Sequence, residues 1–203
     1  MISVAIVDDH RIVIDGIEKN IIESGVAVLT GRAGTIAECW EMLKTEQPDV
    51  LLLDIGLPDG NGMDVCPRIK AKYPAMNILI LTNYAEYTVI SNVLGNGASG
   101  YILKNAMPEE IMEGIRTVAS GKRFLCEDAN VLLQKGKHGG IELTRREGEL
   151  LRLLVQGYTS LEIAEKMCLS YETVRGYRKT LHLKLGVHNT AELTKIAIEK
   201  RLL

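Results

Sequence analysis

The first 120 residues alternate short apolar runs with longer amphipathic stretches, and this alternation restricts the fold more than any other feature of the sequence. The apolar runs are rich in Val, Ile and Leu and cover residues 4–7, 26–29, 50–53, 78–81 and 100–103. Such runs suit strands that are buried on both faces, as in a parallel sheet, and the stretches between them are long enough for crossover helices. The pattern therefore predicts an α/β domain over residues 1–122, with a doubly wound, five-stranded parallel sheet.

The alternation stops after this domain. Residues 123–142 contain a polar, glycine-rich stretch, Lys135–Gly140, of the kind that makes a flexible connection. We predict that residues 123–142 are a linker, whose flexible part follows one short helix.

In residues 143–203, apolar residues recur at the spacing of a helix face. Thr144 followed three residues later by Glu147 is a capping-box sequence, and Ser170 is placed to cap a later helix. Because helices this short are stable only against one another's apolar faces, they are expected to form one bundle. The sequence thus predicts a second, smaller all-α domain over residues 143–203.

Charge divides at the same place as the periodicity. Residues 1–122 hold 10 Lys and Arg against 16 Asp and Glu, whereas residues 123–203 hold 14 against 10. The two parts therefore carry net charges of −6 and +4. A basic part is what a nucleic-acid partner requires, although a charge of +4 also occurs in domains that bind no nucleic acid.

The composition favours a soluble protein of the cytoplasm with no membrane partner. No stretch approaches the roughly 20 apolar residues that span a bilayer, and the N-terminus has no basic lead before Asp8, so it does not resemble a signal peptide. The cysteines are scattered without a C-x-x-C pair, which predicts buried or inert thiols in place of a zinc site or a disulfide framework. They are Cys39, Cys66, Cys126 and Cys168.

Acidic residues follow two of the predicted strands. Asp8 and Asp9 come directly after the first strand, and Asp54 closes the third. Because ligands of an open parallel sheet bind beyond the carboxyl ends of its strands, these carboxylates are expected to converge in one crevice. Their mutual repulsion calls for a cation, and hard oxygen ligands with open positions suit Mg²⁺.

Two further strands end in complementary groups. Thr82 offers a hydroxyl donor at the end of the fourth strand, and Lys104 offers an ammonium after the fifth. Such a set can hold a phosphoryl group, with Asp54 as the nucleophile, a metal and Lys104 neutralising charge, and Thr82 donating a hydrogen bond. Any one of these residues alone would be explained as a helix cap or a solvated loop residue. Because four strand ends all carry groups suited to the same ligand, the pattern favours the phosphoryl site.

The spacing of these residues resembles that of the receiver domains of two-component signalling, which have a flavodoxin-like fold. The matching residues are Asp8, Asp9, the stretch Asp54–Gly62, Thr82 and the stretch Tyr101–Lys104. The resemblance implies that Asp54 accepts a phosphoryl group from a sensor histidine kinase. It also implies that Asp9, Asp54 and the backbone carbonyl of Gly56 ligate Mg²⁺, with Asp8 in support. The phosphoryl-binding and switch residues that it implies are Thr82, Tyr101 and Lys104.

The chain departs from the receiver pattern at two positions beside the predicted site. Receivers more often carry a larger residue at the position of Gly56, and a small one at the position of Asn83, after the switch hydroxyl. Both departures bear on how long the phosphoryl group lasts. Tyr101 also has an alternative interpretation as a plain aromatic at a sheet edge, and only its matching position favours the switch.

The segments 160–167 and 171–185, joined by the short break 168–170, have the lengths of two helices in a helix-turn-helix. Winding the second segment at 3.6 residues per turn separates an apolar face from a basic face. The apolar face holds Val174, Tyr177, Leu181 and Leu185, and the basic face holds Arg175, Arg178, Lys179 and His182. A basic helix can enter the major groove of DNA, although many basic helices are merely solvated.

Residues 140–200 resemble the LuxR-type DNA-binding domain, and its union with a receiver resembles the NarL/FixJ class of response regulators. The matching stretches are Leu143–Glu147, Glu162–Ala164, Thr173–Arg175 and Lys184–Val187. The resemblance implies sequence-specific binding to double-stranded DNA as a dimer. The DNA-contacting residues that it implies are Arg175, Arg178, Lys179 and Lys184. Gly176 departs from the pattern, because relatives usually carry a side chain there and glycine disfavours a helix.

The sequence therefore predicts a two-component response regulator, not an enzyme, in which phosphorylation of Asp54 favours an open form that dimerises and binds DNA. The alternative is a receiver that accepts phosphate but acts through protein contacts. A metabolic hydrolase is disfavoured because Gly56 supplies no second carboxylate.

Overall fold

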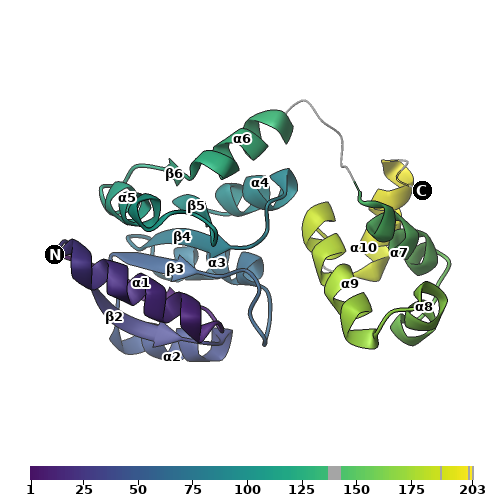
Figure 1. Ribbon diagram of the computed structural model, residues 1–203, viewed down its shortest axis with the longest axis horizontal. Helices are drawn as coiled ribbons and strands as arrows, with labels where there is room; N and C mark the ends of the chain where they lie inside the picture. Colours follow the sequence, from purple (N-terminus) through teal and green to yellow (C-terminus); the bar gives the residue numbers. More distant parts are fainter. Residues whose placement is uncertain (137–142, 188, 201, 203) are drawn as a thin grey trace. The chain divides into compact units, whose positions relative to one another are not determined.

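The computed structural model describes residues 1–136, 143–187, 189–200 and 202. They divide into two compact units, an α/β unit that contains residues 1–85 and 90–134 and a helical unit that contains the described residues after 134. Figure 1 shows the strands and their crossover helices in the first unit and helices alone in the second. The predicted fold class, a parallel α/β domain with a smaller all-α domain, is confirmed.

Within the described residues, the sheet has six strands, and every neighbouring pair runs parallel. The strands are β1 (Ile2–Val7), β2 (Ala27–Ala33), β3 (Val50–Leu53), β4 (Asn77–Thr82), β5 (Gly100–Leu103) and β6 (Phe124–Leu125). Their order is β2-β1-β3-β4-β5-β6, so the chain leaves β1 toward one edge and continues from β3 toward the other. This reversal makes a topological switch point beside β1 and β3, where open sheets bind ligands.

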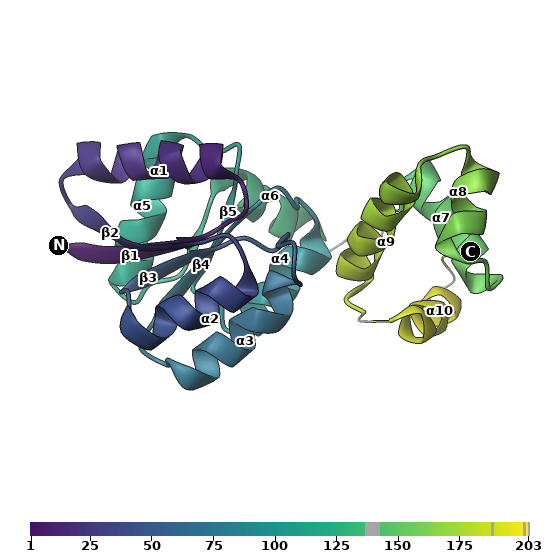
Figure 2. The ribbon, with the colours of Figure 1, turned by 90° about the horizontal axis from the view of Figure 1, so that it is seen from below.

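Helices cover both faces of the sheet, which explains why β3 and the core of β4 are continuously apolar. The crossover helices are α1 (Arg11–Ser24), α2 (Ile36–Thr45), α3 (Gly62–Lys72), α4 (Tyr87–Gly95) and α5 (Pro108–Ala119). Figure 2 shows α1 and α5 on one face of the sheet, with α2 and α3 on the other. Every residue of β3 is buried between these layers.

The sheet has one strand more than the sequence predicted. Phe124 pairs with Gly100 at the edge of β5, and α6 (Glu127–Gly136) follows. A two-residue strand carries no periodicity of its own, so it depends on tertiary contacts, here including the Phe124 ring beside Gly114. A Cβ at Gly114 would lie 3.0 Å from that ring. The first part of the predicted linker thus forms β6 and α6, while 137–142, including most of the glycine-rich stretch, lie outside the described residues.

The helical unit contains α7 (Arg145–Val155), α8 (Ser160–Met167), α9 (Tyr171–Leu185) and α10 (Thr190–Glu199). The predicted capping box is present, because Thr144 accepts from the Glu147 amide and the Glu147 carboxylate accepts from the Thr144 amide. The predicted cap at Ser170 is also present. Buried leucines, isoleucine, methionine and valines from all four helices and the segment after α9 form one core.

Three of the four cysteines are buried, as one form of the thiol prediction has it, and for Cys168 the inert thiol stays a prediction. Cys39, Cys66 and Cys126 are buried, and burial raises the pKa of Cys39 to about 12 and that of Cys66 to about 11. Cys168 is exposed, and it ends α8 in the left-handed conformation, with φ of 53°, at the turn before α9.

Across the ranges described, no helix combines the length and apolar character that a bilayer span requires.

Candidate functional site

The strand ladder continues one residue beyond β1 and β3 and thereby fixes two aspartates. The Asp8 amide donates to the Ala33 carbonyl and the Asp54 amide donates to the Val7 carbonyl, each at 2.9 Å. Asp8 and Asp54 consequently lie at the same edge of the sheet, with only 1% and 4% of their surfaces exposed. The expectation that carboxylates from two strand ends converge is met.

Lys104 joins both of these carboxylates. Its Nζ lies 2.6 Å from Asp8 Oδ2 and 2.9 Å from Asp54 Oδ2, and its amide donates to the Thr82 carbonyl at 2.9 Å. Burial alone would lower the pKa of Lys104, but its hydrogen bonds and charge attraction to the two aspartates outweigh burial and raise it. The lysine is therefore a fully charged counter-ion within the acidic cluster.

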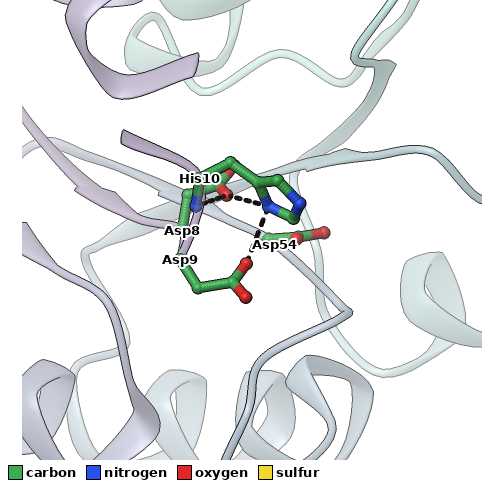
Figure 3. A group of neighbouring side chains, drawn as sticks. All are labelled: Asp8, Asp9, His10 and Asp54. Atoms are coloured by element: carbon green, nitrogen blue, oxygen red, sulfur yellow. Dashed lines mark hydrogen bonds and ion pairs between the residues drawn. The ribbon is translucent and has the colours of Figure 1, made fainter. Parts of the chain in front are cut away.

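Asp9 and His10 complete the cluster, as Figure 3 shows. His10 Nδ1 lies 2.7 Å from Asp9 Oδ1 and 3.0 Å from Asp8 Oδ1, and the His10 amide donates to Asp8 Oδ1 at 2.8 Å. Ligand atoms of Asp8, Asp9, His10 and Asp54 all lie within 4.8 Å of one another, so the group can hold a metal ion. His10 was missing from the predicted site, although its place directly after Asp9 at a strand end was a usable signal.

Thr82 supplies a buried polar atom that fits a phosphoryl ligand. Its side chain is fully buried at the end of β4, and its Oγ1 has no hydrogen-bond partner among the residues that the structure describes. A buried hydroxyl without a partner carries a desolvation cost, unless a ligand oxygen accepts its hydrogen. The donor set of Thr82 and Lys104, beside three carboxylates, fits a phosphoryl group with a divalent metal.

The loop after β3 is held close to the site. A Cβ at Gly62 would clash with the Asp54 carbonyl oxygen, so the loop returns to Asp54 more closely than any side chain would allow. Asp59 accepts hydrogen bonds from the amides of Ile36 and Ala37 at the start of α2, and the bond from Ile36 lowers the pKa of Asp59. The loop is therefore held at two points, at Gly62 beside Asp54 and at Asp59 beside the start of α2.

The space that a larger residue would occupy at Gly56 borders the ring of Tyr84. A Cβ at Gly56 would lie 3.6 Å from Asp54 Oδ2 and 3.8 Å from Tyr84 Cε2. Tyr101 is fully buried, and its hydroxyl donates to the Tyr84 carbonyl at 2.7 Å. Because β5 lies between β4 and β6, Tyr101 is not at a sheet edge. The carbonyl of Gly56 stays a predicted metal ligand.

The basic residues of α9 differ in what they contact. Arg175 is exposed and has no hydrogen bond or ion pair within the described ranges, and Lys179 is partly exposed. Lys184, in contrast, is 15% exposed, with Nζ 3.0 Å from Glu147 Oε2. Arg178 donates from its two terminal nitrogens to Ser160 Oγ and Thr190 Oγ1.

Glu147 links the capping box of α7 to α9 through Lys184. Burial alone would raise the pKa of Glu147, but the hydrogen bond from the Thr144 amide and the contact with Lys184 outweigh burial and lower it. Gly176, on the exposed surface of the same helix, has nothing within 4 Å of a built Cβ. Crowding therefore does not require glycine at this position.

An α/β unit with an acidic site at its sheet edge and a helix-turn-helix unit define a two-part regulatory protein. The family model described as "Response regulator receiver domain" matches residues 4–116, and that described as "Bacterial regulatory proteins, luxR family" matches residues 142–197. The chain belongs to the response regulator family, with a receiver domain followed by a LuxR-type regulatory domain.

Relatives match the chain over its whole length. It is 32% identical to the DNA-binding transcriptional activator DevR/DosR of Mycobacterium tuberculosis, over 98% of this chain and 95% of the relative. It is also 32% identical to the oxygen regulatory protein NreC of Staphylococcus aureus, over 99% of each chain. Among solved structures, it is 29% identical to RcsB in a structure of two RcsB dimers bound to two parallel DNAs, with a TM-score of 0.67 over 97% of this chain and 98% of that one.

We predict that acid weakens the helical unit through Glu147. The folded-state pKa lies below the ordinary 4.5, so the stabilisation is present above pH 4.5 and disappears as the pH falls through the folded-state value. Glu147→Gln should lower the free energy of unfolding by roughly 1–3 kcal/mol at pH 7. The free energy of unfolding of this variant should also fall less than that of the parent as the pH is lowered. Amide exchange of the α7 core, measured from pH 7 down to pH 3, checks this, and a variant as stable as the parent at pH 7 would contradict it.

Gly176→Ala is expected to stabilise α9 by about 1 kcal/mol, since alanine favours a helix and the added methyl meets open space. Gly148→Ala in α7, which also meets open space, is the matched control and should stabilise by a similar amount. Amide exchange of each helix measures both effects. A loss of stability confined to Gly176→Ala would show that glycine is required there.

Proposed function

We propose that a sensor histidine kinase phosphorylates Asp54 and that this phosphorylation controls sequence-specific DNA binding by the helical unit, and so transcription. The observation that carries the proposal is the contact of Lys104 with both Asp8 and Asp54 at the edge of the sheet. Lys104 can neutralise charge at Asp54 before and after phosphorylation, because Asp54 is anionic both as a carboxylate and as an acyl phosphate.

In the transfer, a carboxylate oxygen of Asp54 forms a bond to phosphorus while the bond from phosphorus to the kinase's histidine breaks, and that histidine keeps the electron pair. Lys104 neutralises charge on the phosphoryl oxygens, and the Thr82 hydroxyl donates a hydrogen bond to one of them. Bound Mg²⁺ would be held by Asp9, Asp54 and the Gly56 carbonyl, with Asp8 in support, and would supply further charge neutralisation. We propose no catalysis beyond the handling of this phosphoryl group.

The phosphoryl group gives the buried Thr82 hydroxyl an acceptor, and this change connects the site to Tyr101. Tyr101 is hydrogen-bonded to the carbonyl of Tyr84, two residues after Thr82. A shift of Thr82 toward the phosphoryl group therefore moves the segment that holds the Tyr101 hydroxyl. Phosphorylation would shift the population toward a form that dimerises.

The recognition helix α9 is proposed to enter the major groove of double-stranded DNA, with Arg175 and Lys179 in contact with the duplex. The exposure of Arg175 supports this role. A related structure is described as RcsB of Salmonella enterica serovar Typhimurium bound to promoter P1flhDC with the phosphomimetic BeF3−, at 30% identity and a TM-score of 0.66 over 96% of this chain. For Lys184 we propose a structural role beside Glu147, because their ion pair is largely buried.

Asp54→Asn is expected to abolish covalent phosphorylation by an acyl-phosphate donor with Mg²⁺, because an amide is not a nucleophile for phosphorus. Asp59→Asn is the matched control, since Asp59 lies five residues further in the same loop but caps α2. Intact mass measures the added phosphoryl group, and circular dichroism checks that both variants fold. A phosphorylated Asp54→Asn protein would exclude Asp54 as the acceptor.

DNA affinity is expected to fall steeply with salt, because binding releases counterions from the phosphates. Arg175→Ala should reduce the slope of log affinity against log salt by about 0.9, if Arg175 neutralises one phosphate. Arg146→Ala, which removes an exposed arginine paired with Glu149 on α7, is the control. Fluorescence anisotropy at 50–200 mM salt provides the measurement. An affinity independent of salt would favour the alternative regulator that acts through protein contacts.

A further inference from the structure

We propose that Arg178 is a positioning residue that fixes the recognition helix against its two neighbours and does not itself contact DNA. This inference rests on the proposed function, since it concerns how the same helix is presented to DNA. It concerns one of the residues that the sequence predicted as a DNA contact.

The guanidinium of Arg178 joins three helices of the unit. One terminal nitrogen lies 2.5 Å from Ser160 Oγ, in the first residue of α8, and the other lies 3.0 Å from Thr190 Oγ1, in the first residue of α10. Both bonds are partly buried and reach 18 and 12 residues along the chain. A single side chain of α9 thus holds the beginnings of both neighbouring helices.

The two hydroxyl acceptors are available because other residues cap these helices. Thr159 caps α8 through the Glu162 amide, and Asn189 caps α10 through the Glu192 amide. Ser160 and Thr190 therefore need not cap their own helices, and their oxygens can accept from Arg178. The arrangement assigns separate side chains to capping and to linking the helices.

A cation at two helix N-termini is electrostatically unfavourable, because these are the positive ends of the helix dipoles. Acidic residues in the first turns, Glu162 of α8 and Glu192 of α10, offset the dipoles and the added charge. The position of Arg178 is consequently explained by its geometry, since a guanidinium presents several donors in a rigid plane and can reach two separate oxygens.

Arg175, one turn earlier on α9, shows the contrast. It is exposed and has no partner within the described part of the chain. Arg178 would have to break two hydrogen bonds to reach a base or a phosphate, whereas Arg175 would break none. The two arginines of α9 therefore have different roles: Arg175 contacts DNA, and Arg178 holds the helix in place.

Two variants separate positioning from contact. Arg178→Lys keeps the positive charge but loses the planar fork, because an ammonium is a single point charge. Thr190→Val removes only the acceptor oxygen and leaves Arg178 intact. If Arg178 acts by position, both variants should lower the ratio of specific to non-specific DNA affinity, Arg178→Lys by tenfold or more, while the salt dependence stays that of the parent. The double variant should lose no more than Arg178→Lys alone.

The affinities are measured for the full chain with BeF3− and Mg²⁺, against an enriched binding sequence and an unrelated duplex. If Thr190→Val binds as the parent does while Arg178→Lys loses specificity, Arg178 reads a base and the positioning role is wrong. If Arg178→Lys also binds as the parent does, the guanidinium fork is not needed and the proposal fails.

Amide exchange tests the same role without DNA. In Arg178→Lys, the amides of Ile163 and Leu193, which close the first turns of α8 and α10, should exchange at least threefold faster. The amide of Val174, bonded to Ser170 in α9, is the internal control and should be unchanged. If the parent binds no DNA sequence specifically, the proposed function fails, and these exchange rates alone decide whether Arg178 positions the helices. Unchanged rates at Ile163 and Leu193 would overturn the proposal.

Discussion

The contact of one ammonium with two buried carboxylates holds the receiver site together. Asp8 and Asp54 lie side by side at the edge of the sheet with almost no access to water, where two negative charges repel strongly. Lys104 lies between them and compensates this repulsion. The arrangement depends on strand register, because a shift of one residue in β1, β3 or β5 would turn one of these side chains to the other face. The parallel sheet therefore fixes the positions of the charged groups in the site.

The helical unit uses partly buried cations in a similar way. Lys184 is held by Glu147, and Arg178 is held by two hydroxyls, so these cations of α9 have partners within the unit. The surface that can meet DNA is smaller than the count of basic residues suggests, and Arg175 is its clearest member. This distinction matters for interpreting variants. Under the proposed function, loss of an inward-facing cation would weaken DNA binding through the fold, whereas loss of Arg175 would weaken it through contact.

Local pattern and spacing were sufficient to predict most of the fold. The strands β1 to β5 have apolar runs, and the caps at Thr144 and Ser170 are formed by residues three positions apart. The convergence of Asp8, Asp54 and Lys104 follows from the rule that parallel strands end at one edge. The strand β6 was missed because two residues have no periodicity, and His10 was missed although it adjoins Asp9.

Local pattern and spacing could not predict which residues the basic side chains contact. Lys184 meets a carboxylate 37 residues away, and Arg178 meets a hydroxyl 18 residues away. Helical winding predicts which residues share a face, but it does not predict which of them contact a neighbouring helix. The exposure of Cys168 is likewise a consequence of a turn conformation that glycine or asparagine more often adopts.

The most direct test of the central claim is the selection of bound sequences from random DNA by the full chain, with and without BeF3− and Mg²⁺ as an acyl-phosphate mimic at Asp54. Phosphorylation-controlled DNA recognition predicts that a motif with two half-sites is enriched, and that the mimic increases the enrichment. If no sequence is enriched in either state, the claim is contradicted, and a regulator that acts through protein contacts becomes the better account.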